Sequence, residues 1–261
     1  MRPSQPPIVL SISGHDPSGG AGIQADIETL SSLDCLPVTA VTCLTVQDSR
    51  NILSITPVAA ELVLQQAEII LADYPVKAIK IGLLGDSETA RRVGNLLTTH
   101  CELPVILDPV LAAGGGTDLA GEALIEEIVS SILPRTTIIT PNSIEAQRLG
   151  GKSQLEACAD QLIKAGCDAV LITGTHEESK EVINTLYRPG SAAVSQSWQR
   201  LPESYHGSGC TLASAIAAFL VNGNSLEDAV ALAQAYTWNA LSRGWRPGSG
   251  QYIPDRLHPL K

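Results

Sequence analysis

The sequence has few positive charges: 17 Lys and Arg residues stand against 27 Asp and Glu residues in 261, a formal net charge of -10. Nucleic-acid backbones and anionic membrane surfaces are bound chiefly through clustered Lys and Arg side chains. The charge balance therefore argues against a nucleic-acid partner and against a membrane partner. It is compatible with a single nucleotide, because backbone amides and Mg²⁺ can hold phosphates locally.

Long apolar runs and paired cysteines are also missing. The apolar run at residues 8–12 is too short for a secretory signal or a membrane span, so we expect a cytoplasmic protein. The cysteines form no C-x-x-C pair, which argues against a zinc site and against a disulfide framework. They are Cys35, Cys43, Cys101, Cys158, Cys167 and Cys210.

Two nucleotide-binding fingerprints are absent as well. No G-x-x-x-x-G-K-[ST] pattern occurs, which excludes a P-loop kinase. The run Gly19-Gly20-Ala21-Gly22 lacks the glycine spacing of the dinucleotide fingerprint, which argues against a nicotinamide-dependent dehydrogenase. The same run, followed by Asp26, permits a flexible loop close to a ligand.

Short runs rich in Val and Ile alternate with stretches of helical apolar spacing. Strands are expected at residues 8–13, 38–46, 78–83, 105–110, 137–140, 169–173 and 182–187. This alternation predicts one α/β domain over residues 1–261, with a mostly parallel sheet covered by helices on both faces. Ligands of such sheets bind beyond the carboxyl ends of the strands.

Polar and Gly-rich segments follow these predicted strand ends. They comprise residues 14–22, 47–48, 108–109, 141–145, 174–175 and 206–210. The last of these segments leads into two final helical stretches at 211–221 and 225–242. Because the carboxyl ends of parallel strands share one edge of the sheet, these segments are expected to meet in a single site.

The segment Gly207-Ser208-Gly209-Cys210 precedes an apolar helix. Its glycines allow backbone amides to converge at a helix N-terminus, where the dipole favours an anion such as a phosphoryl group. The same position favours a Cys210 thiolate, which could serve as a general base. The alternatives are an ordinary Gly-rich loop and a packed cysteine.

Asn142 and Glu145 are three residues apart, on one face of a predicted helix after Pro141. Their oxygens suit a hydrated Mg²⁺, but they also suit an Asn N-cap with Glu at the third helical position. Asp108 ends a buried strand at the edge where phosphates and metal would gather, and a structural turn-capping Asp is the competing interpretation.

A long segment, Ser13-Gly14-His15-Asp16-Pro17-Ser18-Gly19-Gly20-Ala21-Gly22-Ile23-Gln24-Ala25-Asp26, resembles the first-strand signature of the hydroxymethylpyrimidine and phosphomethylpyrimidine kinases of thiamine biosynthesis. The resemblance continues in family order to about residue 243. Its further motifs are Thr45-Val46-Gln47-Asp48, Lys80-Ile81-Gly82-Leu83, Leu107-Asp108-Pro109-Val110, Thr140-Pro141-Asn142 with Glu145, Ile172-Thr173-Gly174, and His206-Gly207-Ser208-Gly209-Cys210-Thr211.

The resemblance implies a ribokinase-like fold, a homodimer, and ATP-dependent phosphorylation of an aminopyrimidine alcohol and then of its monophosphate. It implies that Gln47 pairs with the aminopyrimidine edge, with Asp26, Gly14 and Leu83 also in the substrate pocket. It places Asp108, Asn142, Thr173 and Gly174 at ATP, Glu145 at Mg²⁺, and residues 207–210 in the anion hole. Cys210 stands where sugar-kinase relatives have a carboxylate.

The sequence departs from the family at two places. Leu83 stands where Met is common, and Gly114-Gly115-Gly116 replaces a Lys-Ser-Gly or Thr-Ser-Gly after the Asp108 motif. The second difference removes a side-chain donor that could hold phosphate, so it bears most on the second phosphorylation. Pyridoxal or pyridoxine kinase and a non-catalytic pyrimidine sensor are the alternative functions.

Overall fold

A single mixed sheet organises the chain. The computed structural model describes residues 5–112, 119–175, 177 and 179–258. Within them, nine strands pair in the order β3-β2-β1-β4-β5-β6-β7-β8-β9. The strands are β1 (Ile8–His15), β2 (Leu36–Gln47), β3 (Ile52–Pro57), β4 (Val76–Ile81), β5 (Val105–Leu107), β6 (Ile138–Ile139), β7 (Val170–Thr173), β8 (Glu181–Tyr187) and β9 (Val194–Gln199).

The pairings from β2 through β7 are parallel, and β3, β8 and β9 add antiparallel pairs at the two edges. The predicted α/β class with a mostly parallel sheet is therefore confirmed. The sequence analysis missed β3 and β9. Both are edge strands with many exposed and polar side chains, so they lack the continuous apolar run of a buried strand.

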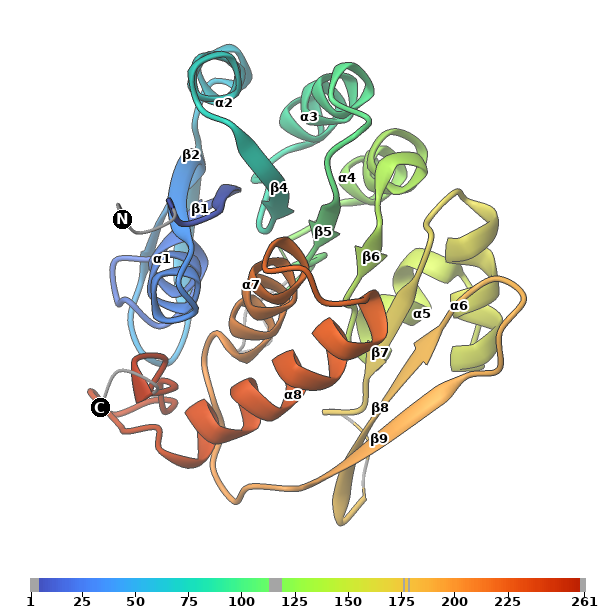
Figure 1. Cartoon of the computed structure of the whole chain (residues 1–261). Helices are drawn as coiled ribbons and strands as arrows, with labels where there is room; N and C mark the ends of the chain where they lie inside the picture. Colours follow the sequence, from blue (N-terminus) through green and yellow to red (C-terminus); the bar gives the residue numbers. More distant parts are fainter. Residues whose placement is uncertain (1–4, 113–118, 176, 178, 259–261) are drawn as a thin grey trace.

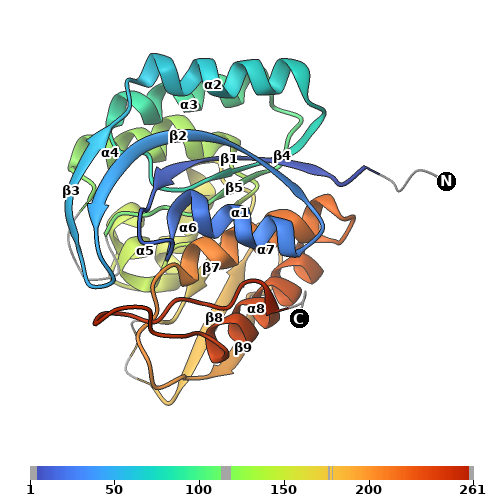
Figure 2. The same cartoon turned by 90° about the vertical axis from the view of Figure 1, so that its left-hand side faces the viewer.

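Helices cover both faces of this sheet, as predicted. They are α1 (Gly22–Ser32), α2 (Ala60–Asp73), α3 (Ser87–Thr99), α4 (Glu122–Glu127), α5 (Ser143–Gly150), α6 (Leu155–Lys164), α7 (Ser208–Val221) and α8 (Leu226–Ser242), with a π-helical turn η1 (Ile128–Ile132) and a 3₁₀ turn η2 (Leu133–Arg135) after α4. Figure 2 views the layers from the side: α2 and α3 lie above the sheet, and α1, α7 and α8 lie below it.

The two-residue period of the strands sends alternate side chains into two cores. In β1, Leu10 and Ile12 join the core beneath α2 to α6, whereas Val9 joins the core formed with α1, α7 and α8. Leu107 and Ile106 divide in the same way in β5. Burial on both faces explains why these strands are nearly continuous in apolar residues.

Two predicted strands are shorter in the structure. The run at 105–110 ends as a strand at Leu107, because Pro109 has no amide hydrogen to continue the ladder after the Asp108 amide donates to the Ile81 carbonyl at 2.8 Å. The run at 137–140 contributes only Ile138 and Ile139. These short central strands have their carboxyl ends close to those of β1 and β4, and Figure 1 shows them side by side across the sheet.

Among the described residues, no helix combines the length and apolar character needed to span a membrane.

Candidate active site

The predicted segments meet around one cavity of about 760 Å³ at the carboxyl ends of the strands. Of the predicted site residues, those lining it are Gly14, Gln47, Leu83, Asp108, Asn142, Glu145, Thr173, Gly207, Ser208, Gly209 and Cys210. Gly174 lies just outside this set, between the lining residues Thr173 and Thr175. The glycines Gly114, Gly115 and Gly116 fall outside the described residues.

The start of α7 contains residues 207–210, for which the sequence analysis expected an anion-binding turn. Gly207 is the N-cap and has a φ of 79°, in the region that favours glycine. Its carbonyl oxygen accepts hydrogen bonds from the Thr211 amide (3.0 Å) and hydroxyl (2.7 Å). Helix geometry leaves the amides of Ser208, Gly209 and Cys210 without intrahelical acceptors, and all three residues line the cavity.

Cys210 is buried beside Asp108. Burial raises the pKa of the Cys210 thiol, and the Asp108 charge raises it further, whereas Lys80 and a hydrogen bond from the Gly22 amide act in the opposite direction. The sequence analysis expected the helix N-terminus to favour a thiolate. The structure corrects this expectation: desolvation outweighs the helix terminus, so the resting group is the thiol.

Asp108 has a raised pKa, first because of its burial. Lys80 and a hydrogen bond donated by the Cys210 thiol oppose this shift. A side chain at Gly209 would place its Cβ only 3.3 Å from Asp108 Oδ1, so the carboxylate lies directly against the anion-binding turn. The thiol and the carboxylate are thus neighbours beside the first turn of α7.

Asn142 and Glu145 form a capping box at the start of α5. Asn142 Oδ1 accepts from the Glu145 amide and Glu145 Oε2 accepts from the Asn142 amide, both at 2.9 Å. The structure therefore shows the helix-capping arrangement that the sequence analysis considered for this pair. Burial and the nearby Asp108 charge raise the pKa of Glu145 to about 8, which indicates an acidic group without enough compensating positive charge.

Asp26 is placed differently from the prediction. It lies on the same buried face of α1 as Ile23 and Leu30, and it is not among the residues lining the cavity. Its Oδ1 is 2.8 Å from Lys80 Nζ, and both side chains are fully buried. Ser11 and Ser214 donate further hydrogen bonds to it at 2.6 and 2.7 Å.

The sequence analysis assigned no role to Lys80, although it quoted the residue within a motif. Burial lowers the pKa of Lys80, but Asp26 and then Cys210 and Asp108 outweigh this effect and raise it. The ammonium group is therefore a fixed positive charge close to Cys210 and Asp108. The feature that could have identified Lys80 from the sequence is a lysine inside an otherwise apolar strand.

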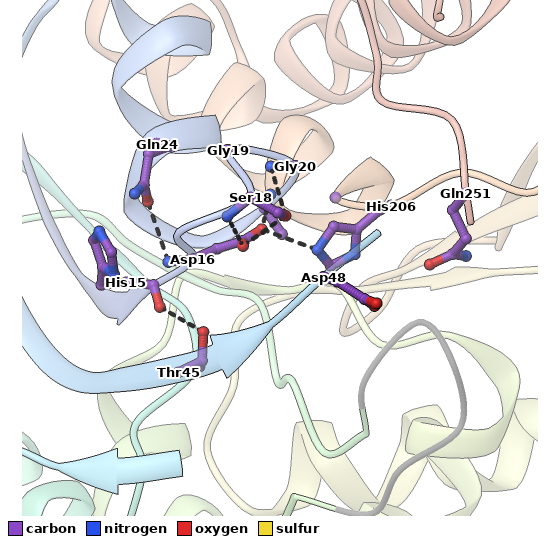
Figure 3. Close-up of polar contacts among 12 residues, drawn as sticks. His15, Asp16, Ser18, Gly19, Gly20, Gln24, Thr45, Asp48, His206 and Gln251 are labelled. Carbon is purple, nitrogen blue, oxygen red and sulfur yellow. Dashed lines mark hydrogen bonds and ion pairs between the residues drawn. The ribbon is translucent and has the colours of Figure 1, made fainter. Parts of the chain in front are cut away.

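A second polar cluster joins two loops that are far apart in the sequence (Figure 3). Asp16 Oδ2 lies 2.9 Å from His206 Nε2 and accepts from the Ala21 amide at 2.7 Å. Asp16 Oδ1 accepts from the Ser18 amide and hydroxyl. Burial alone would raise the pKa of Asp16, but the hydrogen bonds from His206 and Ser18 outweigh it and hold that pKa well below its usual range.

Two tryptophans line the opposite part of the cavity. Trp198 on β9 and Trp238 on α8 stack with ring centroids 6.3 Å apart. Sequence reasoning missed this pair because it missed β9. The rings offer flat apolar surfaces suited to a planar base.

Comparison with known proteins matches the family described as phosphomethylpyrimidine kinase to residues 16–255. A hydroxymethylpyrimidine/phosphomethylpyrimidine kinase of Rhizobium meliloti (strain 1021) is 34% identical over 251 residues, covering 94% of each protein. The structure of the pyridoxal kinase from Staphylococcus aureus in complex with ADP superposes with a TM-score of 0.89 at 29% identity, covering 97% of this chain and 94% of that chain. The phosphomethylpyrimidine kinase from Clostridium difficile 630 gives a TM-score of 0.77 at 26% identity, covering 88% and 97%. These similarities confirm the predicted fold class.

Proposed function

Because this chain belongs to the phosphomethylpyrimidine kinase family, we propose that it uses ATP to phosphorylate 4-amino-5-hydroxymethyl-2-methylpyrimidine for thiamine diphosphate biosynthesis. The product monophosphate is then its second substrate. One observation carries this proposal: Gln47, Asp108, Cys210 and the first residues of α7 all line the same cavity. The cavity therefore combines a recognition amide, an acid–base pair and an anion site.

Gln47 is the residue that recognises the pyrimidine. It stands at the end of β2, half-buried, where its amide can pair with a ring nitrogen and an exocyclic amine together. Gly14 and Leu83 form the wall behind it. A Cβ on Gly14 would lie 2.8 Å from Cys43 Sγ and 3.2 Å from a Leu83 methyl, so the wall leaves no space for a side chain at this position.

Proton transfer runs through Cys210 and Asp108. The thiol takes the proton of the substrate hydroxymethyl group while its own proton passes to the neighbouring Asp108 carboxylate. The substrate oxygen then bonds to the γ-phosphorus of ATP, and the bond from that phosphorus to the β,γ-bridging oxygen breaks, releasing ADP. The amides at 208–210 stabilise the transferring phosphoryl group.

The nucleotide lies across the remainder of the cavity. Asn142, Thr173 and Gly174 contact its phosphates, with Asp108 close to the transferring group. The stacked rings of Trp198 and Trp238 provide the surface for adenine. ADP and AMP-PCP complexes of a Staphylococcus aureus kinase with the same fold support a nucleotide in this chain.

Mg²⁺ fits the acidic side of the cavity. Asp108 and Glu145 are both buried with raised pKa values, so a divalent cation would relieve an uncompensated acidic site. Mg²⁺ keeps several waters and needs few carboxylates, which agrees with the lack of a group of three or more metal-ligating side chains among the described residues. When bound, it would neutralise charge on the ATP phosphates, with Glu145 as its main protein ligand.

The proposal includes a homodimer, as expected from the resemblance. Leu44, Val46 and Leu53 are 52, 57 and 79% exposed on the edge formed by β2 and β3, and a second copy would cover them. Light scattering of the purified protein measures this state. Because ATP is the phosphoryl donor, the enzyme is expected to act in the cytoplasm.

Pyridoxal kinase is the second candidate, favoured by the TM-score of 0.89 with the Staphylococcus aureus pyridoxal kinase. Incubation with ATP, Mg²⁺ and either hydroxymethylpyrimidine or pyridoxal, followed by mass spectrometry, separates the two. The proposal expects the pyrimidine monophosphate and then the diphosphate. Phosphorylation of pyridoxal without phosphorylation of the pyrimidine would refute it, and accumulation of the monophosphate alone would refute the second step.

A further inference from the structure

Arg256, in the C-terminal segment after α8, is buried beside the candidate site. Arg256 is 1% exposed, and its guanidinium group makes a set of directed contacts. Nε donates to Thr211 Oγ1 at 2.9 Å, and Nη1 lies 3.0 Å from Glu28 Oε2. Nη1 also contacts the Gly19 carbonyl at 3.4 Å, and Nη2 donates to the Gly20 carbonyl.

The contact with Thr211 reaches the anion-binding turn through one more hydrogen bond. The Thr211 hydroxyl accepts from Arg256 and donates to the Gly207 carbonyl at 2.7 Å. In a trans peptide the C=O and the following N–H point in opposite directions. Holding the Gly207 carbonyl toward the helix therefore holds the Ser208 amide toward the cavity, where a phosphoryl group would need it.

The contacts with Gly19 and Gly20 tie the other loop of the site to the same guanidinium. A side chain on Gly207 would collide with the Gly20 carbonyl oxygen, and one on Gly20 would collide with the His206 ring. The two loops are therefore packed backbone against backbone. Arg256 donates to one loop directly and to the other through Thr211, so it sets their separation.

The rest of the segment reinforces this arrangement. The Tyr252 carbonyl accepts from the His206 amide at 2.8 Å, and the Gln251 amide donates to the Ser49 carbonyl at 2.7 Å. A buried guanidinium is costly unless its donors are satisfied, and apolar side chains could fill the same volume at lower cost. The planar guanidinium group of Arg256 reaches several acceptors at once, which suits it to hold the two loops in a fixed arrangement.

From these contacts we propose that Arg256 is a positioning residue for phosphoryl transfer, which aligns the Gly207–Ser208 peptide with the Gly19–Gly20 loop. Arg256 is not among the residues that line the cavity. This inference rests on the proposed function for its kinetic test, and it also makes a prediction about backbone exchange that needs no substrate.

The kinetic test compares Arg256→Ala and Arg256→Lys with the wild type. A displacement of about 1 Å in a catalytic group can cost about 10²-fold in rate, so Arg256→Ala should lower kcat about 10- to 100-fold with KM for the pyrimidine changed less than threefold. Arg256→Lys should recover only part of this loss, because an ammonium group cannot reproduce the fork. Added guanidinium ion at millimolar concentration should raise kcat of the Ala variant but not that of the Lys variant.

Thr211→Val tests the same chain of hydrogen bonds without removing the buried charge. It should lower kcat at least fivefold, whereas Thr89→Val should not change kcat. Thr89 is a matched control, since its buried hydroxyl in α3 has no hydrogen-bond partner among the described residues. Leu97→Ala, which truncates a fully buried side chain in α3, should lower the melting temperature and leave kcat within twofold. Wild-type kcat in folded Arg256→Ala or Thr211→Val would overturn the inference.

Hydrogen exchange separates failure of this inference from failure of the proposed function. In Thr211→Val, and in Arg256→Ala if it folds, the hydrogen-bonded amides of residues 206 and 211 should exchange at least fivefold faster, while those of β4 and β5 keep their wild-type rates. Unchanged exchange at residues 206 and 211 would overturn the inference whatever the substrate is. Faster exchange together with a wild type that does not phosphorylate the pyrimidine would support the inference and refute the proposed function.

Discussion

The buried ion pair between Lys80 and Asp26 allows a quantitative test of the structure. Replacing Lys80 with Met keeps the length of the side chain but leaves the Asp26 carboxylate uncompensated, with both positions fully buried. Removing one partner of a buried pair typically costs about 3–5 kcal/mol. Ser11 and Ser214 still donate to the carboxylate in the variant, so we expect a loss near the lower end, about 3 kcal/mol.

A loss of this size is large against a total stability of about 5–15 kcal/mol. It should appear in urea denaturation as a lower midpoint with an unchanged m-value. Adding Asp26→Asn removes the stranded charge and keeps an acceptor for the serines, so the double variant should recover at least half of the loss.

Two results would contradict this reasoning. A loss below about 1 kcal/mol in Lys80→Met would mean that the pair is not buried as described, since exposed pairs contribute about that much or less. A double variant no more stable than Lys80→Met would mean that the lost energy lies in packing and not in the charge.

Other predictions concern the reaction. Cys210→Ala should lower kcat by about two to four orders of magnitude with little effect on ATP binding. Cys210→Asp should retain more activity than Cys210→Ala. Wild-type turnover in folded Cys210→Ala protein would remove the thiol from the mechanism. Gln47→Leu should weaken pyrimidine binding by about 1–3 kcal/mol, and an unchanged kcat/KM would place the pocket elsewhere. Glu145→Gln should raise the Mg²⁺ concentration needed for half-maximal rate. Because the pKa of Glu145 is raised to about 8, its contribution to stability is full below about pH 4.5 and is lost as the pH rises toward 8. Mg²⁺ should therefore raise the melting temperature more at pH 8 than at pH 6. An equal effect at the two pH values would exclude Glu145 as ligand.

Much of the fold could be predicted because the central strands are buried on both faces. Continuous apolar runs such as the one in β1 follow from that burial alone. The edge strands β3 and β9 could not be found in the same way, because half-exposed pairs tolerate serine, threonine and glutamine. The stacked pair Trp198–Trp238 was lost with β9, although both residues line the cavity.

Local sequence determined which polar residues gather at one edge of the sheet, since each follows a parallel strand or precedes a helix. It brought Gln47, Asp108 and Cys210 to one cavity because chain direction alone places strand ends together. It also determined the capping box at Asn142, which needs only residues three apart.

The tertiary structure alone decided how the buried charges are paired and what state Cys210 is in. Asp26 and Lys80 are 54 residues apart, and Arg256 and Gly20 are 236 apart, so no local pattern relates them. Their pairing depends on how α1, α7 and the C-terminal segment pack. The Cys210 thiol follows the same rule: its helix position favours the thiolate, but burial, which only packing determines, raises its pKa.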